Sequence, residues 1–68
     1  MAEETIVQII RLLQALPLRA TVGNLGAIAF ALRPFMTDEL IASILELCQK
    51  KGASETVLKV VEFCLRSL

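Results

Sequence analysis

The sequence predicts an all-α protein, a compact bundle of four short helices, and three observations lead to this fold class. Apolar residues recur at the spacing of an amphipathic helix throughout the chain, and no segment alternates with the period of a strand. Pro17, Pro34 and Gly52 divide the 68 residues into lengths typical of short helices. We therefore expect a single helical domain, 1–68, with two helical hairpins built from helices at about 3–15, 22–33, 38–51 and 55–67.

The first helix, at about 3–15, has one polar and one apolar face. Gln8, Arg11 and Gln14 mark the polar side. Pro17 ends the helix, because proline lacks a backbone donor and disfavours helical geometry in the residue before it. The residues that line the apolar side are Ile6, Ile9, Ile10, Leu13 and Leu16.

The second helix, at about 22–33, offers almost no side for water. Between Thr21 and Phe35 the chain contains one charged residue, Arg33, and one amide, Asn24. One face is bulky and comprises Val22, Leu25, Ile28 and Leu32. The other is small and comprises Gly23, Gly26, Ala27 and Ala31, with Phe30 at its edge. Bulky side chains fill a core and small ones let another helix approach closely, so we expect this helix to be covered on both sides.

The third helix, at about 38–51, has clear signals at both ends. Thr37 is expected to be the N-cap, and the two acidic residues that follow it lie at the positive end of the helix dipole. Two lysines occupy the last turn, and Gly52 stands at the C′ position.

The fourth helix, at about 55–67, is capped by Ser54 and carries a stripe of charged residues. Glu55 and Lys59, and Glu62 and Arg66, are spaced for i,i+4 ion pairs in the favourable order. Apolar residues cover well over half of its circumference: Val57, Leu58, Val60, Val61, Phe63, Cys64, Leu65 and Leu68.

The apolar surface exceeds what a small monomer can bury. The composition is 56% hydrophobic, whereas a domain of this length buries only about 60% of its unfolded surface. We therefore expect a second chain to cover part of it, against the alternative of a monomer in which the second helix is simply central. The candidates for core and interface, which the sequence does not divide between these roles, are Val22, Gly23, Leu25, Ala27, Ile28, Phe30, Ala31, Val60, Phe63 and Leu68.

The charge balance and the residue types exclude several classes of function. Seven basic and seven acidic residues give zero net charge, which argues against nucleic-acid binding and against a polybasic membrane anchor. The chain has no signal-like start and no apolar run of about 18 residues, so we expect a soluble cytoplasmic protein. Without histidine the commonest general base and metal ligand is missing, so we expect no enzyme activity, no cofactor and no metal.

The two cysteines are expected to remain thiols. Cys48 lies close to the turn between the third and fourth helices, and Cys64 lies far from it, on the order of 10 Å apart along the hairpin. That separation exceeds the reach of a disulfide.

An internal similarity links the third and fourth helices. Shifted by sixteen residues, Ile41, Ile44 and Glu46 match Val57, Val60 and Glu62. The pattern resembles the helical hairpins of HEAT or armadillo repeats, although amphipathic helices of equal length also look alike.

A set of residues in the second to fourth helices also carries a family resemblance. They are Arg19, Thr21, Leu25, Ile28, Leu32, Glu39, Ile41, Leu47, Cys48, Gly52, Leu58, Val61, Leu65 and Arg66. In these positions the chain resembles the MOZART family of mitotic-spindle organising proteins, small helical subunits of γ-tubulin complexes. The resemblance implies a module that folds around a helical segment of a larger partner. The first helix is additional, and the turn after Gly52 departs from the family's usual Asn-Pro-Glu-Ala-Leu.

These observations together predict a non-enzymatic protein–protein interaction or assembly module. It is expected to bury an apolar face of the second and fourth helices against a second chain, as a homo-oligomer or with a helical partner. Two alternatives remain: an amphipathic bundle that associates with lipid, and a designed or fragment bundle without a biological partner. The absence of Trp and Tyr, the usual interfacial aromatics, argues against the lipid alternative.

Overall fold

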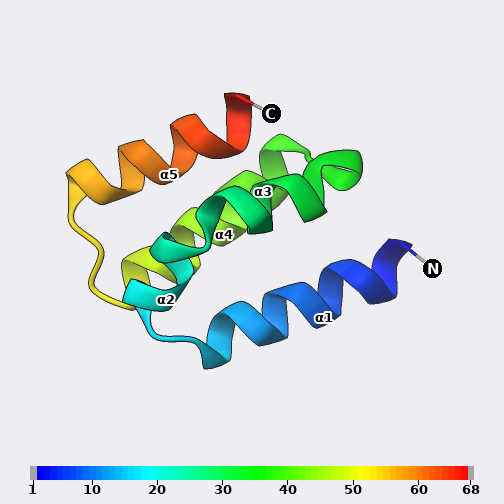
Figure 1. The fold of residues 1–68 in the computed structure, drawn as a ribbon, viewed down its shortest axis with the longest axis horizontal. Helices are drawn as coiled ribbons and strands as arrows, with labels where there is room; N and C mark the ends of the chain where they lie inside the picture. Colours follow the sequence, from blue (N-terminus) through cyan, green and yellow to red (C-terminus); the bar gives the residue numbers. More distant parts are fainter. Residues whose placement is uncertain (1, 68) are drawn as a thin grey trace.

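The computed structural model describes the backbone of residues 2–67 and the side chains of residues 4–67. Within this range the chain forms α1 (Ala2–Ala15), α2 (Leu18–Gly23), α3 (Leu25–Leu32), the 3-10 turn η1 (Arg33–Phe35), α4 (Asp38–Lys50) and α5 (Glu55–Ser67), and no strand. In Figure 1, α3 lies in front of α4, and α1 and α5 flank this pair on opposite sides. The predicted all-α class is confirmed.

The second predicted helix, 22–33, differs from the structure because it begins earlier and is interrupted at Asn24. Pro17 has extended backbone geometry, and α2 starts directly after it. Asn24 leaves helical geometry with φ −110°, and its Nδ2 donates to the carbonyl of Ala20 at 2.7 Å. The backbone N–H of Asn24 donates to the same carbonyl at 3.1 Å, so this oxygen accepts two hydrogen bonds from one asparagine, a residue whose side chain commonly bonds to nearby backbone where a helix is interrupted. The result is a short α2 followed by α3.

The predicted ends of the last two helices are confirmed. The hydroxyl of Thr37 accepts a hydrogen bond from the Leu40 amide at 3.1 Å, and the hydroxyl of Ser54 accepts one from the Val57 amide at 3.2 Å. Gly52 has φ +90°, a left-handed conformation that glycine adopts without the steric cost of a Cβ. These caps fix the antiparallel hairpin of α4 and α5.

Helix α1 packs against α4 and is hydrogen-bonded to the turn that follows α4. The Lys51 ammonium donates to the carbonyl oxygens of Leu13 at 2.5 Å and Gln14 at 3.0 Å, and also to that of Leu16. These carbonyls belong to the C-terminal end of α1, where the helix has no internal donors left for them. A cation there also interacts favourably with the helix dipole.

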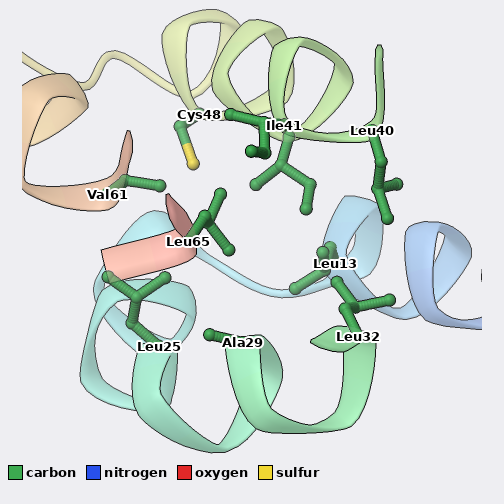
Figure 2. Close-up of a cluster of buried hydrophobic side chains, with 10 residues drawn as sticks. Leu13, Leu25, Ala29, Leu32, Leu40, Ile41, Cys48, Val61 and Leu65 are labelled. Carbon is green, nitrogen blue, oxygen red and sulfur yellow. The ribbon is translucent and has the colours of Figure 1, made fainter. Parts of the chain in front are cut away.

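The core lies where the helices meet. Its buried apolar side chains are Leu13, Leu25, Ala29, Leu32, Leu40, Ile41, Ile44, Cys48, Val61 and Leu65. Figure 2 shows them converging from α1, α3, α4 and α5. Burial of each large aliphatic side chain contributes about 1.5–3 kcal/mol, so this cluster is the main source of stability.

Candidate interaction surface

The structure divides the candidate residues between core and surface. Leu25 is buried, and Val22 and Ile28 are half-buried. Leu68 lies outside the described residues. The exposed candidates are Gly23, Ala27, Phe30, Ala31, Val60 and Phe63. The bulky face of the second predicted helix is therefore core, whereas its small face is on the surface of this chain.

Helix α3 differs from the other described helices because none of its eight residues has a polar side chain. Its outward side is nevertheless exposed and carries Gly26, Ala27, Phe30 and Ala31. The side chain of Phe30, the largest of these residues, is 68% exposed. A helix that is apolar all round is normally buried, so the outward side of α3 lacks the covering that its composition predicts.

The glycine on this side serves no packing purpose within the chain. A Cβ added at Gly26 would meet no atom within 4 Å, and its backbone angle is not in the left-handed region. Glycine inside a helix costs about 1 kcal/mol relative to alanine. The close helix approach expected at the small face is therefore not made by any described element of this chain.

Two exposed apolar residues, Val60 and Phe63, lie on the outer part of helix α5. Val61 is fully buried, and successive residues are about 100° apart around the axis. Arg66 lies on the flank that faces α4, because its Nη1 donates to Asp38 Oδ1 at 2.7 Å. Val60 lies on the opposite flank, which faces α3, the other helix that α5 packs against. Phe63 lies next to Val60, pointing away from the core, and is 72% exposed.

The aromatic residue of α3 lies toward the same junction. In Figure 2, Ala29 lies toward Leu65 of α5, whereas Leu32 lies beside Leu13 of α1. Successive residues of a helix are rotated by about 100°, so Leu32, Ala29, Gly26 and Phe30 follow one another in this order around the α3 axis. Gly26 and Phe30 therefore lie beyond Ala29, on the part of the outer surface that is nearer to α5. We call the resulting surface the Phe30–Phe63 face. It comprises Gly26, Ala27, Phe30, Val60 and Phe63, whereas Ala31 is exposed on the side of α3 toward α1.

Among residues 4–67, the other large apolar side chains that are exposed do not form a comparable surface. Val7 and Leu12 of α1 are 45% and 59% exposed. They lie about 140° apart around the α1 axis, so they point in different directions. Such single exposures are ordinary on soluble proteins.

Charged residues border the Phe30–Phe63 face along α5. Arg66 Nε donates to Glu62 Oε2 at 3.0 Å, and Lys59 Nζ lies 3.9 Å from Glu55 Oε1. Both predicted i,i+4 pairs are therefore present. Hydrogen bonds to Asp38 and then to Glu62 raise the pKa of Arg66 above its ordinary value.

The two cysteines are free thiols in different surroundings. Cys48 is buried, and this burial raises the pKa of its thiol, an effect that the nearby charge of Lys51 partly opposes. Cys64 is half-buried and lies between Val60 and Val61 around the α5 axis. A raised pKa keeps the Cys48 thiol protonated and chemically inert at neutral pH.

The described residues offer little for small-molecule or metal chemistry. No group of three His, Cys, Asp or Glu side chains in this range could hold a metal ion. A hollow of about 500 Å³ lies between η1 and the adjoining ends of α4 and α5, where Arg66 is already paired with Asp38. Residues 2–67 also contain no helix long and apolar enough to cross a membrane.

Comparison with protein-family models, curated proteins and solved structures finds no match to this chain. The resemblance to the MOZART family therefore stays a prediction from the residues that carry it. Gly26 belongs to the Phe30–Phe63 face but was not among the residues predicted for core and interface. Its position on the small face of the second predicted helix was the sequence feature that could have identified it.

Proposed function

We propose that this chain is a non-enzymatic helical module that binds another protein chain through the Phe30–Phe63 face. One observation carries the proposal: α3 has no polar side chain, yet its outward side is exposed, and α5, which packs against α3, carries the exposed Phe63. Exposed apolar surface of this kind is typical of protein–protein contact sites.

The energetics support the same role. Phe30 and Phe63 are 68% and 72% exposed, and burial of their rings would recover solvation free energy at about 25 cal/mol per Å². Aromatic anchors are also the residue type most enriched at the centre of protein interfaces. The exposed Gly26 adds a position where a partner helix can approach the α3 backbone closely.

The non-catalytic part of the proposal follows from the residue chemistry. The sequence has no histidine, and the buried thiol of Cys48 is held protonated. The described carboxylates lie at the surface, several in ion pairs with lysine or arginine. A general base or activated nucleophile needs a perturbed group in a shaped pocket, and the described residues do not combine the two.

Site-specific photo-crosslinking in cells that express the chain tests the proposal. A benzoylphenylalanine in place of Phe63 should give a discrete protein adduct on a denaturing gel. The same group in place of Gln8, an exposed polar position on α1, is the control and should give none.

Two results would contradict the proposed function. One is the absence of any protein adduct from position 63, or equal adducts from both positions. The other is an adduct with lipid alone, which would favour the amphipathic, lipid-associating alternative.

A further inference from the structure

We infer that the occupant of the Phe30–Phe63 face is a second copy of this chain, related by a two-fold axis that sets the two α5 helices antiparallel. The inference rests on the proposed function, because it names the partner of the same surface. Three properties of the described residues carry it: the order of charges beside the face, its relief, and its area.

The charged residues along α5 follow an order that is complementary to itself. Glu55, Lys59, Glu62 and Arg66 are spaced by four, three and four residues, and their signs alternate. Read backwards, the stripe has the same spacing and the opposite sign at every position. In an antiparallel pair of α5 helices, Glu55 therefore lies opposite Arg66 of the second copy, and Lys59 opposite Glu62 of the second copy. Such complementarity fixes register and suppresses wrong partners.

These charged groups are free to take part in such contacts. The side chains of Lys59 and Glu55 are 75% and 86% exposed, although they form a pair within the chain. Arg66 has five N–H donors, and its contacts with Glu62 and Asp38 use two of them. Each pair within one copy can thus join a wider network at the rim of a dimer.

The relief of the face also suits contact with its own copy. Phe30 and Phe63 are mostly exposed, whereas Gly26 and Ala27 on the same face have a single methyl group or none. A two-fold contact brings the same patch together from both sides, so it needs protruding and low positions on one surface. The face has both, and it has no charge at its centre that a second copy would repel.

The exposed area is sufficient for a small dimer. The chain exposes 4663 Å², whereas a compact monomer of its mass exposes about 4,200 Å². Phe30 and Phe63 together expose on the order of 300 Å², taking about 200 Å² for a whole side chain. Two copies would bury about twice that area from the aromatic rings, and Val60 and the small residues bring the total toward the lower end of about 1,200 Å² for specific interfaces. We therefore expect a dimer whose population depends on concentration.

Sedimentation equilibrium of the full chain under reducing conditions tests the inference, from about 1 µM to about 1 mM. The wild type should shift from 7.5 kDa toward twice that mass as the concentration rises. Phe63→Ser should raise the dimer dissociation constant about tenfold or more, because exposed aromatic anchors dominate interfaces. Leu12→Ser is the matched control, since Leu12 is 59% exposed on α1, away from the face, and it should leave the constant unchanged.

A charge-exchange experiment tests the antiparallel register. In the proposed homodimer, position 59 lies opposite position 62 of the second copy. K59E therefore places two acidic groups opposite each other, and E62K places two basic groups opposite each other. Each variant alone should be monomeric where the wild type is dimeric. Mixing them restores both opposite-sign contacts, so the mixture should form a heterodimer. Thermal melts of each variant confirm that the monomers remain folded.

The outcomes separate this inference from the proposed function. A wild-type chain that remains at 7.5 kDa throughout overturns the second copy as partner. If crosslinking at position 63 still yields an adduct with a different protein, the proposed function stands. Loss of the dimer in Leu12→Ser but not in Phe63→Ser overturns the location. Failure of the mixed variants to associate, with a wild-type dimer present, overturns the antiparallel arrangement.

Discussion

The ammonium group of Lys51 lies 3.0 Å from the carbonyl oxygen of Gln14, near the C-terminal end of α1. This hydrogen bond joins residues 37 positions apart in the sequence. Leu13 is fully buried in the core, and the Lys51 ammonium also donates to its carbonyl, so the lysine links the C-terminal end of α1 to the turn after α4.

Replacement of Lys51 by methionine should therefore destabilise the fold. Methionine keeps the length of the side chain and removes the charge and its donors, so the carbonyls at the end of α1 lose their partner. We expect a loss of about 1–2 kcal/mol in the free energy of unfolding, measured with urea. Lys50→Met is the control, because Lys50 is exposed and lies 3.6 Å from Glu46 in a surface pair. It should change stability by less than about 0.5 kcal/mol. Equal effects of the two variants would show that Lys51 does not cap α1.

Two alanines of α3 should respond oppositely to enlargement. Ala29 is fully buried where α3 meets α5, and Ala29→Leu should cost about 1–3 kcal/mol through overpacking. Ala27 is exposed on the Phe30–Phe63 face, and Ala27→Leu should leave monomer stability within about 0.5 kcal/mol. Unfolding by urea at low protein concentration, where the monomer dominates, measures both. A large loss in Ala27→Leu would mean that the outer side of α3 is packed within the chain.

The buried thiol of Cys48 predicts a specific dependence of stability on alkaline pH. Burial raises the pKa of this thiol above its ordinary value of 9.0, so the folded chain holds the proton more tightly than the unfolded chain does. The contribution of the protonated Cys48 thiol to the free energy of unfolding is fully present below the pKa that the thiol has in the unfolded chain. This contribution is lost as the pH rises through the pKa that the thiol has in the folded chain. Urea unfolding at about pH 8 and about pH 10 should show a fall that Cys48→Ala reduces and Cys64→Ala retains. An identical fall in Cys48→Ala would rule out this thiol as its source.

The elements with local signals could be predicted from the sequence. Thr37 and Ser54 are the N-caps of α4 and α5, as predicted. An N-cap can be predicted because it depends only on one side chain and the backbone amide three residues later. Gly52 takes the left-handed conformation expected after a helix. Helix α2 was missed as a separate element, because its interruption depends on the local geometry at Asn24 rather than on apolar periodicity.

The division between core and surface could not be predicted, because it depends on which helices become neighbours. Val60 and Val61 are adjacent and equally apolar, yet Val61 is fully buried and Val60 is 51% exposed. The bond from Lys51 to α1 joins distant residues and has no local pattern. The small face of the second predicted helix was predicted to be a contact surface, and only the packing shows that a Cβ added at Gly26 would meet no atom of the chain within 4 Å.

Fluorine NMR of the chain labelled with fluorophenylalanine tests the central claim most directly. The sequence contains three phenylalanines, and the structure places Phe30 and Phe63 on the exposed face and Phe35 half-buried elsewhere. Single Phe→Leu variants assign the three resonances. We predict that the Phe30 and Phe63 resonances shift together as the protein concentration rises, while the Phe35 resonance stays in place. Resonances that are all independent of concentration, or a Phe35 shift equal to the other two, would contradict association through the Phe30–Phe63 face.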